Sequence, residues 1–463
     1  MPRYVPRYAT ALGGVAAALL AATTPAAVGA TTPAHDRWHA TMSVQTVDSS
    51  VAARTDRRPV AGAVYDRRAE LTVISWPGAH EDNYVQAYDH RRHTWSAPVF
   101  VGEGDGDSHN YPTIVQAADG HFLVFRGLHN TQLVVSRSPS AHSIAGTWTE
   151  QVISAGVAAS YPMPFRADNG DIFVFYRETT ETIDKSAAQD TRPMLYVRST
   201  DNGLSWQNSS QLTGDRYAVG SSDPDQLRPD NLNEIYFGQL RYDPDRDVVR
   251  IVWTLAGGGP GLHKHDVYHR NLYYATFSPR DLHFRAADGT DLGTQVNNTD
   301  QETYAKVADT AVELPGGVKS PDYIQTVGLL AAGHRPFVAW MQADATGTLH
   351  DKVSVYARGA WTTTEVGTGM RVRDMEPVSP TAWRVYTTVD TQPNIDTWLL
   401  RDTRHGIVWT HESTLPTAKP VQRIEVVTNF RDPIRILATG ASSDRDVSVA
   451  DGDISVAGFT HHR

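Results

Sequence analysis

Four side chains that can move protons or bind a carboxylate flank two successive turns of this sequence. His109 and His129 lie before and after the Asp-Gly turn of "GDGDSHNYPTIVQAADGHFLVFRGLHN", residues 104–130. Tyr161 and Arg177 lie before and after the Asp-Asn-Gly turn of "MPFRADNGDIFVFYRE", residues 163–178. If each turn joins two antiparallel strands, the side chains lie at the strand ends opposite the turns. We therefore expect all four on one edge of the fold, where functional groups gather.

This set of side chains suits β-elimination beside a uronic acid. The reaction needs a donor or cation to neutralise the carboxylate so that C5 becomes acidic, a base for the C5 proton, and an acid for the oxygen leaving C4. Arg177 can hold a carboxylate in a bidentate fork, histidine titrates near neutral pH, and a tyrosine beside a cation can exchange a proton. We predict His109, His129, Tyr161 and Arg177 as catalytic residues. The structural alternative is packing or hydrogen bonding at strand ends, with Arg177 pairing with Glu178.

A repeated strand pattern must position these residues. From Trp38 onward, short alternating or β-branched runs are separated by turn sequences, with almost no sustained helical period, which indicates an all-β chain. Four-strand units recur at roughly 40 to 60 residues, and we count about seven of them. This period predicts a seven-bladed β-propeller with four-stranded antiparallel blades. The stretch "WHATMSVQTV" is expected to add a closing strand to the last blade.

One unit carries a sharper structural motif. "STDNGLSW", residues 199–206, matches the Asp-box pattern of Ser or Thr, Asp, Gly and Trp. In this pattern Asp201 bonds the turn backbone, Gly203 supplies a positive φ and Trp206 packs between strands. Asp-boxes occur in propellers of many activities, so the motif supports the fold rather than a function.

The N-terminus predicts export. Arg3 and Arg7 precede an Ala/Leu-rich stretch over residues 9–22 and small residues up to Ala30, which predicts a secretory signal peptide over residues 1–30. The alternative is a membrane anchor, but the apolar run is shorter than the roughly 20 residues that span a bilayer. We expect residues 31–463 to form a single propeller domain, secreted to the extracellular space.

The composition and charge of the chain limit the classes of partner that it is expected to bind. The chain has 463 residues, a formal net charge of -10, no cysteine and 11 Trp with 19 Tyr, as in a turn-rich globular protein without disulfides. No Lys/Arg run follows the predicted signal peptide, so the electrostatic footprint of a nucleic-acid binder is missing. We expect a monomer that binds neither nucleic acid nor membrane, and whose uronate-containing substrate meets a local cationic site.

The sequence resembles a known family. "DSHNYP", the second histidine in "GLHN", the Tyr161 to Arg177 pair and "YFGQLRYDP…HRNLYYA" are similar to BNR-repeat propellers that include ulvan lyases and rhamnose-glucuronate lyases, from roughly residue 100 to 280. The resemblance implies a seven-bladed propeller and metal-independent β-elimination by His109, His129, Tyr161 and Arg177. Either histidine can be the base under this resemblance.

Further residues are expected to contact substrate. Asn110 follows the first histidine, and the family's additional tyrosine corresponds either to Tyr217 or to Tyr236. The glycine-rich loop "GGGPGLHKHDVYHR", residues 257–270, should lie over the same face and offers His263 and His265. Their spacing matches no metal motif of defined geometry, so we assign no metal ligand. No cofactor is expected to be required for catalysis, and a structural divalent metal is left open.

Two other classes of function share this fold. A non-catalytic carbohydrate-binding propeller would use the same pocket without proton transfer. A sialidase-like hydrolase would need three converging arginines and a Tyr-Glu nucleophile pair, which the sequence does not assemble. The polymer that is cut, and whether it is cut internally or at its end, cannot be deduced from these residues.

Overall fold

The structure is a computed structural model. It describes residues 40–52, 62–104, 106–107, 112–126, 129–179, 192–221, 228, 232–256, 269–310, 325–332, 335–344, 348–389, 391–403, 406–440 and 448–461. The predicted signal peptide, residues 1–30, lies outside the described residues. Residues 40–462 form one unit, and no helix among its described parts is long and apolar enough to cross a membrane.

Nearly all regular structure is β, because alternating apolar runs are cut into short lengths by turn residues. Three sheets contain the strands of the first half of the unit, and one of them also contains the last three strands of the chain. The nine-stranded sheet has β1 (Ala40–Val51), β32 (Gly452–His461), β31 (Ile434–Gly440), β30 (Val421–Arg431), β2 (Ala63–Asp66), β3 (Leu71–Pro77), β4 (Asn83–Asp89) and β5 (Thr94–Trp95) in order, with β6 (Val99–Gly102) paired to β4. The next sheets are β7 (Thr113–Gln116), β8 (Phe122–Phe125), β10 (Leu133–Arg137) and β11 (Thr149–Ile153), then β9 (His129–Thr131), β12 (Ala159–Arg166), β13 (Ile172–Glu178), β14 (Met194–Ser199) and β15 (Gln207–Asn208).

Three further sheets follow along the chain. They are β16 (Glu234–Asp243), β17 (Val248–Ala256), β18 (His269–Phe277), β19 (Phe284–Arg285) and β20 (Asp291–Gly293) with β21 (Lys306–Ala308) on β18; β22 (Gln325–Ala332), β23 (Arg335–Ala343), β24 (Leu349–Ala357) and β25 (Ala360–Thr368); and β26 (Arg371–Ser379), β27 (Ala382–Thr388), β28 (Asn394–Thr403) and β29 (Gly406–Pro416). The described helices are short: α2 (Ser209–Thr213), α3 (Asn298–Asp300), a π-helical turn (Gln301–Ala305) and a 3-10 turn (Ala79–Glu81). The prediction of a mostly-β chain is confirmed.

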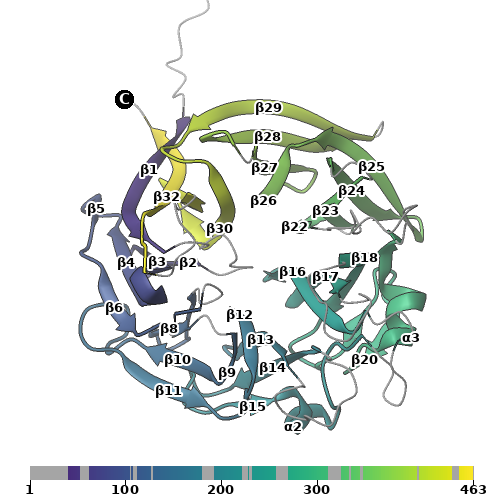
Figure 1. Ribbon diagram of the computed structural model, residues 1–463, viewed down its shortest axis with the longest axis horizontal. Coiled ribbons are helices and arrows are strands. Elements are labelled where there is room, and N and C mark those ends of the chain that lie inside the picture. The colour runs from purple at the N-terminus through teal and green to yellow at the C-terminus, as the bar shows by residue number, and fades with distance from the viewer. Residues whose placement is uncertain are drawn as a thin grey trace, which may run out of the picture. The chain divides into compact units, whose positions relative to one another are not determined.

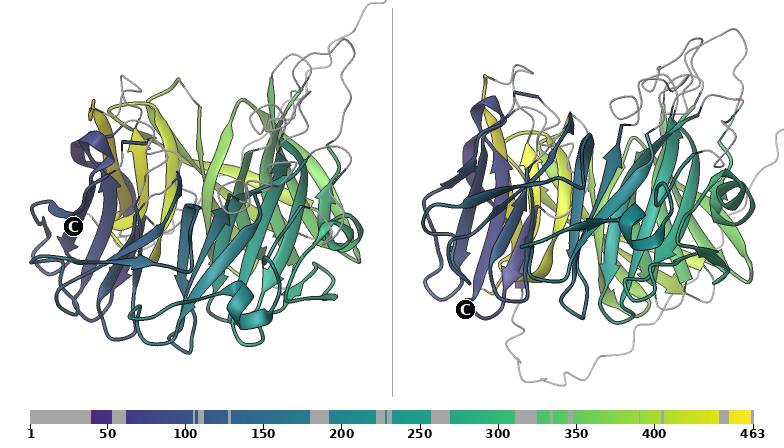
Figure 2. Two further views of the ribbon diagram at one scale, coloured as in Figure 1. Left: turned by 60° about the horizontal axis from the view of Figure 1, so that its bottom comes forward. Right: turned by 90° about the horizontal axis from the view of Figure 1, so that it is seen from below.

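The sheets follow one another in a ring around a common centre (Figure 1). Seen from the side, their strands run between the two faces of the ring (Figure 2). The inner strands β2, β7, β12, β16, β26 and β30 line a cavity of about 800 Å³. The ring is joined where the chain ends meet, because β1 pairs with β32 from Ala40↔His461 onward. This pairing confirms the predicted closing strand.

Neighbouring sheets pack through side chains that alternate along each strand. On β13, Phe173 and Phe175 enter the cluster shared with β16 to β18, whereas Ile172, Val174 and Tyr176 enter the cluster shared with β8 and β10. The alternation follows from the geometry of a β-strand, in which successive side chains point to opposite faces of the sheet. Arg177 therefore lies on the same face of β13 as the two phenylalanines, toward β16.

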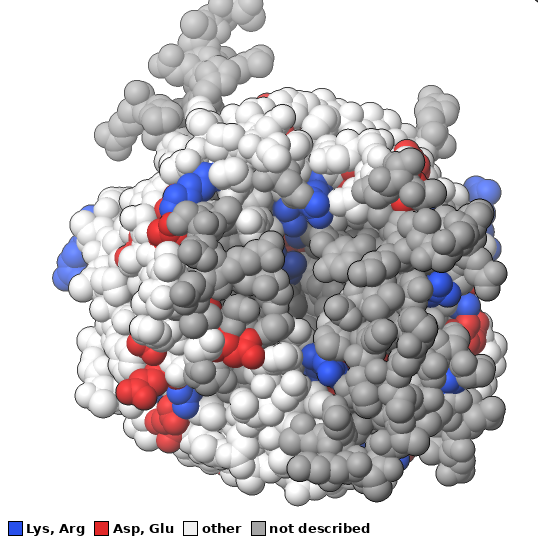
Figure 3. Space-filling view, viewed as in Figure 1, with Lys and Arg blue, Asp and Glu red and all other residues white. Residues whose placement is uncertain are grey.

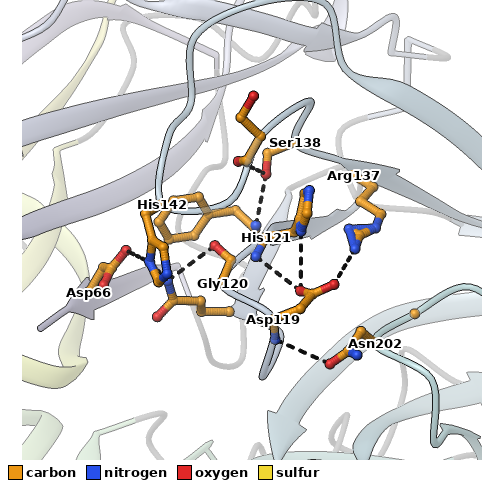
Figure 4. A network of polar contacts seen from close by, with 12 residues as sticks. Asp66, Asp119, Gly120, His121, Arg137, Ser138, His142 and Asn202 are labelled. Carbon is orange, nitrogen blue, oxygen red and sulfur yellow. Dashed lines mark hydrogen bonds and ion pairs between the residues drawn. The ribbon is translucent and has the colours of Figure 1, made fainter. Parts of the chain in front are cut away.

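The turn ends of the sheets are held by polar contacts between neighbours (Figure 4). His142 Nδ1 lies 2.8 Å from Asp66 Oδ2 of the preceding sheet, and Asn202 Oδ1 accepts the Asp119 N–H at 3.3 Å from the following sheet. Within the 199–206 turn, Asp201 Oδ1 accepts N–H groups at 3.1 and 2.9 Å, and Gly203 has a φ of 86°. These contacts hold the turn ends of neighbouring sheets in place. The positions of the residues at the opposite ends of the strands then follow from the strand register.

Candidate active site

Arg177, near the end of β13, is the centre of the candidate site. Only 1% of the residue is exposed. Its guanidinium carbon lies 4.7 Å from the ring centroid of Tyr161 and 4.5 Å from that of Tyr236. The two ring centroids are 6.3 Å apart, so the tyrosines lie on adjacent rather than opposite sides of the guanidinium. Such contacts are favourable cation–π interactions, and they hold the planar group in one orientation.

Tyr161 reaches this position through an irregular backbone. The pairing of β12 with β13 shifts register between Ser160 and Met163, and Tyr161 itself has a φ of 59°. A bulky residue rarely adopts the left-handed region, and such strain concentrates at functional sites. The bulge adds a residue to β12 and re-aims the tyrosine side chain. The predicted meeting of Tyr161 and Arg177 is thus present, by way of a bulge rather than a regular strand end.

His129 belongs to a different sheet from the one its position in the sequence suggests. We expected it at the exit of the strand that follows the Asp-Gly turn, but β8 ends at Phe125 and His129 begins β9. Strand β9 pairs with β12, where His129 lies opposite Ser160, and Ser160 in turn lies opposite Arg177. The expectation for the hairpin was wrong in this respect, because the three residues of β9 pair with β12 of the next sheet. The exchange places His129 in the same cross-strand row as Arg177.

Polar contacts orient the histidine. His129 Nδ1 lies 2.9 Å from Asp107 Oδ2, and a carboxylate on one ring nitrogen fixes which nitrogen remains for other partners. The next residue, Asn130, has a φ of 60° and donates its N–H to Ser160 Oγ at 2.9 Å. Thr179 donates to the side-chain oxygen of Asn130. His109 and Asn110, the other predicted members of this group, lie outside the described residues.

Of the two tyrosines left open by the sequence, Tyr236 is the one on the guanidinium. Burial raises the pKa of Tyr236 to about 12, although the Arg177 charge opposes that rise. Its ring meets His269 edge-on at 4.8 Å. Tyr217 instead packs against the hydrophobic cluster shared by β8, β10 and β13. The predicted contacts of His263 and His265 lie outside the described residues.

The charge of Arg177 is compensated at a distance rather than by an ion pair. By hydrogen-bond geometry, none of its three guanidinium nitrogens has a partner in the part of the chain that the structure describes, although the Tyr236 hydroxyl lies close enough to favour the charged form. Burial alone would lower the pKa of Arg177, but Tyr236, Tyr161 and Glu234 raise it. Glu234 is 2% exposed and lies 3.6 Å from Arg192 Nε. A buried guanidinium without hydrogen bonds is costly to keep unless a ligand meets it.

Three acidic residues lie near the site: Glu178, which the sequence offered as an ion-pair partner of Arg177, and Asp107 and Glu234, which were not predicted. Glu178 points to the opposite face of β13 from Arg177, so the alternative ion pair between the two residues does not form. Burial raises the pKa of Glu178 to about 7. Asp107 stands two residues before His109, and Glu234 two before Tyr236. Because Glu234 and Tyr236 are two residues apart on one strand, their side chains lie on the same face. This spacing could have predicted Glu234 from the sequence.

The centre of the ring is hollowed on one face (Figure 3). Figure 3 shows a depression at the centre of the ring, with Lys and Arg side chains on its margin. Across the described residues, no group of three or more His, Asp or Glu side chains is arranged to hold a metal ion. What the described residues offer is a buried guanidinium against two phenol rings, with His129 in the same cross-strand row.

A ring of antiparallel sheets with functional groups at one end of the strands is the architecture of a β-propeller. Residues 63–368, more than half of the chain, match the family described as "BNR repeat-containing family member". The chain belongs to this family. The predicted BNR-repeat resemblance is thereby confirmed.

Two curated relatives of the chain are ulvan lyases. "Ulvan Lyase-PL25" of Pseudoalteromonas sp. (strain PLSV) is 25% identical over 264 residues, covering 51% of this chain and 50% of the relative. "Ulvan lyase" of Alteromonas sp. (strain LOR) is 25% identical over 273 residues, with the same two shares. The chain spans about half the length of the curated relatives it matches.

Solved structures extend the likeness to nearly the whole chain. A polysaccharide lyase "PL25-Ulvanlyase bound to -[GlcA(1-4)Rha3S]-" has a TM-score of 0.69 at 14% identity, covering 89% of this chain and 95% of that one. The polysaccharide lyase Uly1 has a TM-score of 0.60 at 10% identity, covering 90% and 98%. At such identities the likeness shows the fold.

Proposed function

We propose that the protein is a polysaccharide lyase that cleaves a uronate-containing polysaccharide by β-elimination and releases a 4,5-unsaturated uronate. The observation that carries the proposal is Arg177, a buried guanidinium held by two tyrosine rings with none of its nitrogens hydrogen-bonded to a described residue. A planar fork without partners matches the two oxygens of a carboxylate. The similarity to ulvan lyases supports the same chemistry.

In the proposed reaction, Arg177 neutralises the substrate carboxylate. The C5–H bond then breaks, its proton passes to a base, and a C4=C5 double bond forms as the C4–O bond breaks. The leaving oxygen takes a proton from an acid, for which Tyr161 is our candidate. Its ring already rests on the guanidinium that would hold the substrate carboxylate.

The base is one of the two histidines. His129 lies in the cross-strand row that contains Ser160 and Arg177, and Asp107 holds its Nδ1. This arrangement supports His129 as a group that accepts a proton at Nε2 while Asp107 stabilises the resulting imidazolium, as in other His–carboxylate pairs. His109 is proposed as the second group of the pair, on the family resemblance alone. Asn110, Tyr236, His263 and His265 are proposed as substrate contacts.

We further propose seven blades. The single parallel pairing of Val64 with Thr428 joins β30 to β2, so the nine-stranded sheet divides naturally into one blade of β30, β31, β32 and β1 and another of β2 to β6. With the other five sheets this gives seven units. We also keep the proposals that catalysis needs no cofactor and that the protein is exported, since a polymer too large to enter a cell must be cut outside it.

The test is the ultraviolet absorbance of the unsaturated product. Purified protein is mixed with ulvan, with glucuronate-bearing plant gums and with bacterial uronate polysaccharides, and absorbance is followed beside a reducing-end assay. A rise in absorbance with at least one polymer is expected. New reducing ends without absorbance would point to a hydrolase, and binding with neither signal to a carbohydrate-binding module. Either outcome would overturn the proposal.

A further inference from the structure

Five arginines gather at the turn end of the nine-stranded sheet. Arg67 and Arg68 lie in the β2–β3 turn, Arg91 and Arg92 in the β4–β5 turn, and Arg431 at the end of β30. We call these five residues the arginine turn patch. The side chains of Arg92, Arg91 and Arg431 are 81%, 62% and 43% exposed. The patch is therefore open to solvent.

The patch lies at the other end of the strands from the candidate site. Arg67 lines the same cavity as Asp168 and Gly170 of the β12–β13 turn. Arg177 stands at the far end of β13 from that turn, roughly 20 Å away at the rise of a β-strand. A group bound at the patch would not touch Arg177.

The two arginine pairs are presented by turns of one design. Asp66 Oδ1 accepts the N–H of Arg68 at 2.9 Å, and Asp89 Oδ1 accepts the N–H groups of Arg91 and Arg92 at 2.8 and 3.0 Å. An aspartate that bonds the following backbone fixes such turns. The sequences "DRRAE" and "DHRRH" therefore project arginine pairs from rigid tips, so less conformational entropy is lost when they bind.

Positive charge is in excess at the patch. One carboxylate oxygen of Glu70 pairs with Arg91 Nε at 2.8 Å, and the other pairs with Arg431 Nη1 at 3.0 Å. These two salt bridges link the β2–β3, β4–β5 and β30–β31 turns. Asp89 accepts Arg92 Nη1 at 2.9 Å. Asp66, the third carboxylate, is 1% exposed and bonded to His142. Asp432 follows Arg431 but is paired with Arg435 at 2.6 Å. Apart from that pair, two partly exposed carboxylates face the five arginines.

The positive charge of this patch contrasts with the negative net charge of the whole chain. The chain has a formal net charge of -10. The turns at equivalent places in the following sheets carry acids, namely Asp119, Asp168 and Asp243. Figure 4 shows Asp119 with its partners Arg137 and His121. Among the described turns that join the first and second strands of these sheets, only the β2–β3 turn carries two adjacent arginines.

We propose that the arginine turn patch docks the anionic polysaccharide outside the active site. The inference rests on the proposed function for the identity of the polymer. The guanidinium group of arginine can bind carboxylate and sulfate groups through two parallel hydrogen bonds. A polysaccharide with negative charges repeated along its length can therefore contact several arginines of these turns at once. A second point of attachment raises the local concentration of the polymer at the candidate site without new contacts there.

The test compares two variants that lose the same charge. The patch variant carries Arg67→Gln, Arg68→Gln, Arg91→Gln and Arg92→Gln. The control carries Arg216→Gln, Arg246→Gln, Arg358→Gln and Arg401→Gln, four exposed arginines on other sheets. Affinity electrophoresis in ulvan, in a glucuronate-bearing gum and in neutral dextran measures binding at low and high salt. The protein used throughout also carries Arg177→Met, so that cleavage does not consume the polymer.

We expect the patch variant to bind at least one anionic polymer about tenfold more weakly at low salt, with the loss fading at high salt. The control variant should bind like the parent, and dextran should retard none of them. Equal binding by patch variant and parent, or no binding by the parent, would overturn the proposal whether or not the protein proves to be a lyase. Binding to equimolar phosphatidylglycerol–phosphatidylcholine vesicles but to no polysaccharide would overturn it in favour of a membrane surface.

Discussion

Replacing Arg177 by methionine separates a functional arginine from a structural one. Methionine keeps much of the volume and loses the charge. The guanidinium makes no hydrogen bond to a described residue, so the substitution removes two cation–π contacts, each contributing at most about 2 kcal/mol when desolvated. It also removes the penalty of burying an ion, which is several kcal/mol. The free energy of unfolding should therefore stay equal or rise.

Activity should fall steeply in the same variant. Hydrogen bonds to charged groups contribute about 1.5 to 3 kcal/mol each, so losing a bidentate pair in the transition state removes about 3 to 6 kcal/mol. At 1.36 kcal/mol for each factor of ten, kcat/KM should drop roughly 10² to 10⁴-fold. The assay is the initial rate of absorbance from the unsaturated product, with urea unfolding measured on the same samples.

Arg198→Met is the matched control. Arg198 lies on β14 of the same sheet, its Nε lies 2.8 Å from Asp171 Oδ2, and its guanidinium packs on the Phe173 ring at 5.7 Å. Its loss leaves Asp171, which is 7% exposed, without this partner, and should lower stability by about 1 to 3 kcal/mol while kcat/KM is kept. The reasoning is refuted if Arg177→Met destabilises the fold as Arg198→Met does but retains near-normal turnover.

Three further outcomes are expected. Tyr161→Phe keeps the ring on Arg177 but removes the hydroxyl, so kcat should fall about 10² to 10⁴-fold with KM little changed; undiminished kcat would exclude Tyr161 as the acid. Asp107→Asn should lower kcat by at least about tenfold, because the imidazole loses the carboxylate that orients its Nδ1, and a kinetic pH profile identical to that of the wild type would remove Asp107 from the site. Glu178 has a folded pKa of about 7 against 4.5 in its ordinary state. Its burial therefore costs nothing below pH 4.5, and the penalty grows to about 3 kcal/mol as pH rises through 7. Glu178→Gln should abolish that fall in urea unfolding; an unchanged fall would assign it to other groups.

The repeated elements could be predicted from the sequence, because their signals are local. Alternation of apolar residues and turns such as Asp119-Gly120 depend on near neighbours along the chain, and so the strands, the closing strand β1 and the 199–206 turn could be predicted. The meeting of Tyr161 with Arg177 was also within reach, since one hairpin joins them. The repeat period alone could not fix how the sheets divide into blades.

Contacts between different sheets could not be predicted from the sequence and are visible only in the folded chain. Tyr236 is far from Arg177 along the chain, and its place on the guanidinium depends on how β16 packs against β13. His129 leaves its own hairpin because β9 pairs with β12, a choice between two ladders of similar local propensity. The arginine turn patch likewise unites β2, β4 and β30, which the closure of the ring brings together. Such contacts depend on packing and register between segments that are distant along the chain. A local sequence pattern therefore does not predict them.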